Sequence, residues 1–166
     1  MSLNASDMSD LELKHLAERF LFEYAACLND ERYEEWPAFF EEGDCRYEIL
    51  SRENYDLGLP APLMGCYSHG MVTDRVLMLV KKTLTWRKMY FRHAITNVRV
   101  DRTGESSLGV KANVTVHQTD LEGVASLYLV GRYEDELVLR DGRLRIRKKA
   151  VILDSFGIDN MLAVPV

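Results

Sequence analysis

Cysteine is scarce in this chain of 166 residues, and no two cysteines lie close together. Cys27, Cys45 and Cys66 are an odd number of thiols, and no CxxC pair is present. Zinc sites and iron–sulfur clusters are built from closely spaced cysteines and histidines, so no local motif here predicts either of them. Scattered thiols without an obvious pairing suit a reducing compartment, and we therefore expect a cytoplasmic protein.

A basic surface, a membrane span and a secretory leader are also missing. The net charge of −5 argues against a nucleic-acid partner, because binding to phosphates requires a basic footprint. No apolar run approaches the roughly 20 residues that cross a bilayer, so we expect no membrane partner. The N-terminal stretch MSLNASDMSDLE has neither a basic nor an apolar region, and we expect no signal peptide. The nucleotide-binding and nucleophile motifs GxGxxG, GxxxxGK[ST] and GxSxG do not occur.

What is present is typical of one globular domain, with 47% apolar and 28% charged residues. We expect a single domain over residues 1–166, with a flexible arm at 1–9 and the folded part at 10–166. Ser9 and Glu12 form a possible capping box for a first helix, and its apolar residues recur at helical spacing. They are Leu13, Leu16, Ala17, Phe20, Leu21, Tyr24 and Leu28. Shorter helices are predicted over 31–40, around Pro37, and over 71–82, with a cap at Thr73-Asp74.

Strands dominate the second half of the chain. We predict a strand at 45–50, a long loop at 51–70, and strands at about 90–100, 107–118, 124–139 and 143–154. Asp141-Gly142 is a two-residue hairpin signal between the last two strands. Period-2 alternation predicts one buried and one polar face, and in the last strand it assigns Lys149 to the polar face with Arg143, Arg145 and Arg147. Helices followed by hairpin-connected strands indicate an α+β fold, with helices packed on a curved, mainly antiparallel sheet.

Such a sheet, crossed by helices on its concave side, makes a cone with an apolar pocket. Small isomerases and dehydratases use pockets of this kind with a buried aspartate or histidine as base. The candidate catalytic residues are Asp74, His93 and Tyr47, with Tyr24 beside them. Sequence spacing does not show whether any of them reaches a substrate.

His93, in the strand YFRHAITNVRV, has three possible roles: catalytic base, metal ligand or buried structural side chain. A metal site would need partners, but His15, His69 and His117 fall on a helix, a loop and another strand without HxH, HxxxH or HxxE spacing. We therefore predict no metal site and expect His93 to be hydrogen-bonded to a backbone carbonyl or a carboxylate. His15 is expected to be solvated.

Two features favour an interaction protein over a free-standing enzyme. The basic residues of the last strand either remain solvated, pair with Glu134 and Glu136 across the sheet, or meet a partner protein. The apolar ending MLAVPV either returns to its own core or packs on a neighbouring subunit.

A series of segments carries a resemblance to a known family. In chain order they are YEEWPAFFEEGDCRYEI, MVTDRVLMLV, FRHAITNVRV, VASLYLVGRYEDELV and LRIRKKAVILDS. Together they resemble the small (beta) subunit of bacterial Rieske-type aromatic-ring-hydroxylating dioxygenases, from about residue 10 to the C-terminus. The resemblance implies the cone-shaped α+β fold of nuclear transport factor 2, scytalone dehydratase and ketosteroid isomerase.

The resemblance also implies a function in aromatic catabolism. The chain would be a non-catalytic subunit without cofactors, while an alpha subunit carries the Rieske [2Fe-2S] cluster and the mononuclear iron. The assembly would be α3β3, or a homotrimer of this chain alone. The expected subunit-interface residues are Arg75, Arg92, Arg99, Arg145 and Arg147.

The segments ENYDLGLPAPLMG and DSFGIDNMLAVPV are closer to beta subunits that serve carboxylated aromatics of the salicylate, anthranilate or terephthalate type. Two alternatives stay open. One is a stand-alone isomerase or dehydratase that uses Asp74 or His93, and the other is a ligand-binding or scaffold domain of the same fold.

Overall fold

A six-stranded sheet with the order β2-β1-β6-β5-β4-β3 organises the computed structural model, which describes residues 7–81, 87–155, 157–158 and 162–166. All neighbouring strands are antiparallel except β1 and β6, which are parallel. In chain order the elements are α1 (Asp10–Asn29), η2 (Tyr33–Phe39), β1 (Arg46–Ser51), α2 (Arg52–Asp56), β2 (Met64–Cys66), α3 (His69–Val80), β3 (Tyr90–Arg102), β4 (Ser107–Thr119), β5 (Ala125–Arg140) and β6 (Arg143–Leu153).

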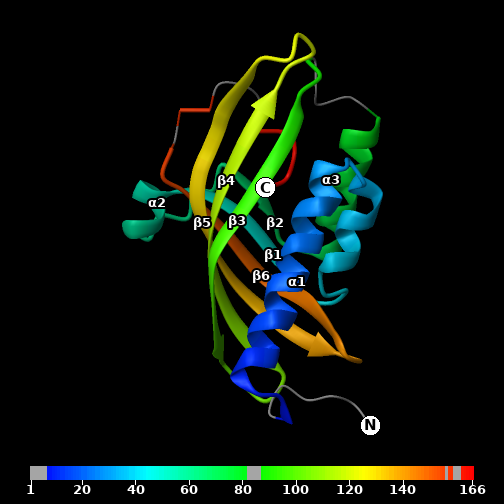
Figure 1. Cartoon of the computed structure of the whole chain (residues 1–166), viewed down its shortest axis with the longest axis vertical. Coiled ribbons are helices and arrows are strands. Elements are labelled where there is room, and N and C mark those ends of the chain that lie inside the picture. The colour runs from blue at the N-terminus through cyan, green and yellow to red at the C-terminus, as the bar shows by residue number, and fades with distance from the viewer. Residues whose placement is uncertain (1–6, 82–86, 156, 159–161) are drawn as a thin grey trace.

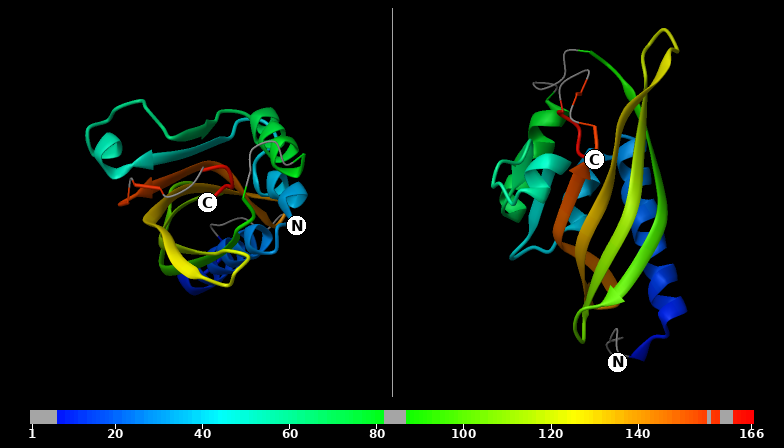
Figure 2. Two further views of the ribbon diagram at one scale, coloured as in Figure 1. Left: turned by 90° about the horizontal axis from the view of Figure 1, so that it is seen from above. Right: turned by 90° about the vertical axis from the view of Figure 1, so that its left-hand side faces the viewer.

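The long strands β3, β4 and β5 twist and curl, and α1, η2 and α3 lie along the open side of the curl (Figures 1 and 2). The short helix α2 lies on the opposite side of the sheet (Figure 1). Seen from above, the C-terminal end lies inside the curl (Figure 2, left). This is the predicted α+β cone, with the core between the concave face of the sheet and the helices.

Helix α1 begins as its sequence predicts. The Ser9 backbone N–H donates to Glu12 Oε2 at 2.7 Å, and the Glu12 backbone N–H donates to Ser9 Oγ at 3.3 Å, which confirms the capping box. Its apolar stripe faces the core, where Leu13, Ala17 and Leu21 are buried. Residues 1–6 of the expected arm lie outside the described residues, whereas Met8 packs against the core and accepts a hydrogen bond from Arg102.

The predicted loop at 51–70 contains two short elements that the sequence did not reveal. Ser51 Oγ accepts from the Asn54 backbone N–H at 3.2 Å and caps α2, and β2 pairs with β1. Elements of three to five residues have too few positions to show a period, so the surrounding glycines and prolines dominated the prediction. The helix predicted at 31–40 is the 3₁₀ helix η2, which contains Pro37.

Helix α3 begins two residues earlier than predicted. Its cap is Ser68, whose Oγ accepts from the Met71 backbone N–H at 3.3 Å. The expected cap at Thr73-Asp74 is wrong, because the Thr73 hydroxyl instead donates back to the His69 carbonyl at 3.0 Å, inside the helix.

The hairpin between β5 and β6 has the predicted turn. Asp141 and Gly142 both have positive φ, 49° and 74°, as a two-residue turn of this kind requires. Within the hairpin the register shifts: Glu136 pairs with Lys148, but Leu137 pairs with Ile146. Arg147 is therefore the extra residue of a β-bulge.

This bulge overturns the predicted face of Lys149. Beyond it the alternation of β6 is inverted, so Lys149, Val151 and Leu153 turn to the concave interior and are buried. Ala150 and Ile152 turn to the other side, where they form a small cluster with Leu50. The prediction that Lys149 belongs to the solvated face with Arg147 is wrong for this reason.

Candidate functional site

The interior of the cone contains a charged pair that is shielded from water. Lys149 on β6 and Asp135 on β5 are direct partners in the sheet register, and Lys149 Nζ lies 2.9 Å from Asp135 Oδ2. Both side chains are 0% exposed. The ammonium also lies over two aromatic rings, 3.3 Å from the centroid of Tyr133 and 4.6 Å from that of Tyr24. The attraction of these rings for a cation partly replaces the lost hydration of the lysine.

Burial opposes ionisation of both partners. It raises the pKa of Asp135 and lowers the pKa of Lys149, and each group pulls its partner back towards the charged form. Asp135 Oδ1 and the Tyr133 hydroxyl have no hydrogen-bond partner among the described residues. Burying two charges costs much desolvation energy. The stability of the folded chain therefore depends on both residues being present, because removal of one would leave the other charge buried and unpaired.

The C-terminal residues occupy the space beside this pair. The Val166 carbonyl accepts hydrogen bonds from the hydroxyls of Tyr24 at 3.0 Å and Tyr47 at 3.2 Å. The Val166 backbone N–H donates to Tyr47 Oη at 2.8 Å, and Val166 is 1% exposed. Arg75 Nη2 on α3 donates to the Leu162 carbonyl at 3.0 Å and holds the same segment from outside. We predicted that the apolar C-terminal residues either return to the core of their own chain or pack on a neighbouring subunit. In the structure they return to the core of their own chain.

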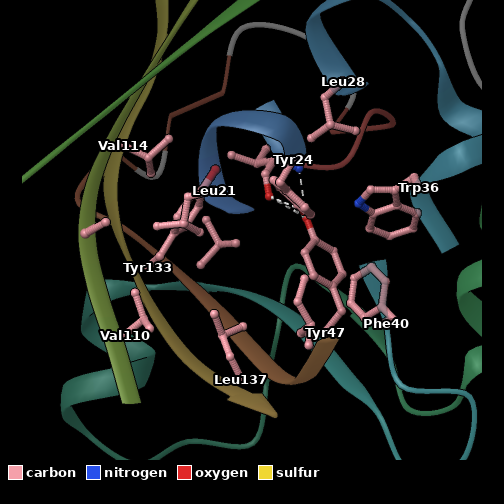
Figure 3. Close-up of a cluster of buried hydrophobic side chains, with 14 of the residues drawn as sticks. Leu21, Tyr24, Leu28, Trp36, Phe40, Tyr47, Val110, Val114, Tyr133 and Leu137 are labelled. Carbon is pink, nitrogen blue, oxygen red and sulfur yellow. Dashed lines mark hydrogen bonds between the residues drawn. The ribbon is translucent and has the colours of Figure 1, made fainter. Parts of the chain in front are cut away.

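Aromatic side chains close the cone around Val166. Trp36 stacks edge-to-face on Phe40 and Tyr47, with ring centroids 4.9 and 5.3 Å apart, and all three are buried (Figure 3). Burial raises the pKa of Tyr24 and Tyr47 well above the ordinary value, so both hydroxyls stay protonated. Tyr47, a candidate catalytic residue, is thus a fixed part of the core.

His93 is attached to α1. Its backbone N–H and its ring Nδ1 both bond to Asn29 Oδ1, at 2.9 and 2.8 Å, which makes Nδ1 the donor. The expected partner was a backbone carbonyl or a carboxylate, and the structure has a side-chain amide. Burial, and secondarily the charge of Lys149, lowers the pKa of His93 to about 4. The ring is therefore neutral at neutral pH, with a buried Nε2 that has no partner among the described residues.

The remaining candidates do not gather around His93. Asp74 lies on the exposed side of α3, outside the interior. His15 and His117 are exposed, and His69 Nε2 bonds to the Pro37 carbonyl at 3.1 Å. Among the side chains that the structure describes, no three histidines, cysteines or carboxylates come together as a metal site. No helix in the described part of the chain is long and apolar enough to cross a bilayer.

The five arginines expected at subunit interfaces have different surroundings. Arg75 is bound within the chain, and Arg147 pairs with Glu41 at 3.2 Å and with Glu136 at 3.1 Å, one of the cross-strand partners expected. Among the residues that the structure describes, Arg145 has only a weak bond, to the Leu144 carbonyl at 3.4 Å.

Arg92 and Arg99 are exposed on β3 and form no ion pair within the described residues. These two remain the best placed of the five to meet another chain.

The sequence pattern placed Lys149 on the wrong face of β6 and did not indicate Asp135 as its partner. The run Arg147-Lys148-Lys149 is a signal for the bulge in β6. Three consecutive charged residues interrupt the alternation of apolar and polar residues, and an extra residue in the strand is one way to accommodate such an interruption. No local sequence feature indicates that Asp135 is buried, because it stands between two other acidic residues, Glu134 and Glu136, in β5.

The family model described as "Ring hydroxylating beta subunit" matches residues 23–160. The small subunit of anthranilate 1,2-dioxygenase from Burkholderia cepacia is 33% identical over 86% of this chain and 88% of its own length. The beta 2 subunit of the terminal oxygenase component of terephthalate 1,2-dioxygenase from Comamonas is 28% identical over 86% of this chain and 91% of its own length.

Solved structures agree with this similarity. One described as the beta subunit of an aromatic-ring-hydroxylating dioxygenase, from Novosphingobium aromaticivorans, superposes with a TM-score of 0.85 at 33% identity, over 94% of this chain and 98% of the other. A scytalone-dehydratase-like structure from the same organism has a TM-score of 0.71 at 21% identity, over 93% of this chain and 92% of the other, and shares the fold.

Removing one partner of the buried pair is expected to be far more harmful than removing both. Lys149→Met or Asp135→Leu alone should lower the free energy of unfolding by about 3–5 kcal/mol, because each leaves an unpaired buried charge. The double variant Lys149→Met/Asp135→Leu should recover most of that loss. Urea unfolding of all four proteins measures the coupling.

The exposed pair Lys14–Glu18 on α1, 3.8 Å apart, provides the control. The same cycle with Lys14→Met and Glu18→Leu should give a coupling of at most about 0.5 kcal/mol. Single substitutions at Lys149 and Asp135 that simply add up in the double variant would refute the buried pair.

His93 should make the protein less stable in weak acid. Its pKa is about 4 in the folded chain, against an ordinary value of 6.5, so the unfolded state binds the extra proton between those pH values. Stability therefore falls as pH drops through this window, by about 2 kcal/mol between pH 7 and pH 5 from this residue.

Urea unfolding at pH 7 and pH 5 checks this expectation, with His93→Gln as the comparison. The Gln variant should lose less stability on acidification than the parent chain. Equal losses in both proteins would show that His93 is accessible to protons in the folded state.

Proposed function

This chain belongs to the family of ring-hydroxylating beta subunits, and we propose that it is the small, non-catalytic subunit of an aromatic-ring-hydroxylating dioxygenase. Its task is then to support the assembly of the oxygenase with a larger, catalytic alpha subunit. A cone that is filled by its own side chains suits a building unit better than a reaction chamber.

The filled interior is the observation that carries this proposal. In the interior, Lys149 pairs with Asp135, and the hydroxyls of Tyr24 and Tyr47 bond to Val166, which is buried in the core. His93 is bonded to Asn29, and Asp74 lies outside. An isomerase or dehydratase that uses Asp74 or His93 is therefore not favoured.

The cofactors of the complex belong, in this proposal, to the alpha subunit. It would hold the Rieske [2Fe-2S] cluster and the mononuclear iron, while this chain holds no cofactor. The stoichiometry would be α3β3, with a homotrimer when this chain is alone, in the cytoplasm.

Aromatic carboxylates are the proposed substrate class of the complex. Two relatives are named as subunits of anthranilate and terephthalate dioxygenases, and both of those compounds are carboxylated aromatic rings. The alpha subunit would select among them, so this chain serves a given substrate only through its partner.

Co-expression with the gene for a ring-hydroxylating alpha subunit from the same genome tests the proposal. We expect the isolated chain to be colourless and free of iron, and the co-purified complex to contain iron and to hydroxylate anthranilate or terephthalate when electrons are supplied. Iron analysis, sizing chromatography and product detection are the measurements. A chain that neither binds a large subunit nor changes its activity would contradict the proposal.

A further inference from the structure

A polar groove of about 520 Å³ crosses the outer face of the sheet, away from the core. It lies over β3, β4 and β5. Lys111 and Asn113 on β4 point into this face, whereas their neighbours Val110, Ala112 and Val114 belong to the core. The polar residues that line the groove are Asn97, Arg99, Lys111, Asn113, Arg132 and Glu134.

A local irregularity of β3 forms one wall. Thr96 pairs with Asn113 and Arg99 pairs with Lys111, so β3 has two residues, Asn97 and Val98, opposite one residue of β4. Asn97 has a φ of 55°, a conformation that asparagine tolerates better than most residues. Bulges re-aim side chains, and this one brings Arg99 beside Lys111 at the edge of the groove.

The groove has an excess of positive charge. Its one carboxylate, Glu134, already accepts a hydrogen bond from Arg132 Nε at 3.0 Å and one from the Tyr55 hydroxyl at 2.8 Å. Lys111 Nζ is 4.0 Å from Glu134, at the limit of an ion pair, and Arg99 pairs with no described residue. Arg99 without a described partner and Lys111 with only this long contact are the two cations of the groove best placed to pair with an external anion.

The shape of the groove decides between classes of anion. Small-molecule sites are enclosed, whereas this groove is open along the face of the sheet, and Val98, Ala112 and Tyr133 line it together with the charged groups and amides. An open groove would leave much of a small aromatic carboxylate in contact with water. Polar, solvent-accessible contacts are typical of the rim of a protein interface.

We propose that this groove binds an acidic segment of the alpha subunit, whose aspartate or glutamate side chains pair with Arg99 and Lys111. The inference rests on the proposed function, since it presupposes such a partner. The groove would determine the rate of encounter and the salt dependence of assembly, which is how peripheral charge pairs act at interfaces.

Charge reversal in the groove tests the proposal on the co-expressed complex. Arg99→Glu/Lys111→Glu is expected to weaken binding of the alpha subunit about 100-fold at low salt, since like charges then face each other. Raising the ionic strength should weaken binding of the unaltered chain but should not weaken binding of the groove variant, because salt screens the attraction in the first and the repulsion in the second. The matched control Arg19→Glu/Lys81→Glu makes the same change in charge at two exposed positions outside the groove and should leave the affinity unchanged.

The outcomes separate this inference from the proposed function. If the unaltered chain binds the alpha subunit and the groove variant binds equally well, the groove inference is wrong while the function stands. If the control weakens binding as much as the groove variant, the effect comes from net charge and the inference is also wrong. If the groove variant alters only the self-association of the isolated chain, the occupant is a second copy of this chain instead. An unaltered chain that binds no alpha subunit would overturn both the groove inference and the proposed function.

Circular dichroism and thermal unfolding verify that both variants are folded.

Discussion

An ammonium and a carboxylate that lie entirely out of water, Lys149 and Asp135, determine how the interior of this cone is arranged. Taking both charges from solvent is costly, so the surroundings must compensate, and two tyrosine rings do so at 3.3 and 4.6 Å from the ammonium. The ring of Tyr24 belongs to the same side chain whose hydroxyl holds Val166. The charge pair, the two tyrosine rings and Val166 therefore pack together, and they join α1, β5 and β6.

A unit packed in this way explains why a fold shared with enzymes can serve assembly. In the interior, Lys149 and Asp135 are bonded to each other, and His93 is held neutral by burial. Charged side chains that could bind another chain lie on the outer face of the sheet, where Arg92 and Arg99 form no ion pair with any described residue. Membership in the beta-subunit family agrees with this division, in which the interior provides stability and the surface meets other chains.

Local patterns predicted most of the fold. The four long strands lie within about two residues of their predicted bounds, because alternation and the Asp141-Gly142 turn are encoded by neighbouring residues. The charged run Arg147-Lys148-Lys149 interrupts the alternation without fixing the position of the bulge at Arg147, and this one-residue shift sends Lys149 to the opposite face. The partnership of Tyr24 with Val166 joins positions 142 residues apart, and no periodicity reports such a contact. The sequence thus identified His93 and Tyr47 as noteworthy but not what holds them.

The most direct test of this account is the activity of the assembled oxygenase when the interior of this chain is changed. The measurement is the amount of hydroxylated product per iron in complexes that carry either His93→Gln or Lys149→Met/Asp135→Leu. If the interior is structural, turnover per iron should equal that of the unaltered complex, even where the yield of complex changes. A large fall in turnover per iron in a fully assembled complex would show that these residues take part in the reaction.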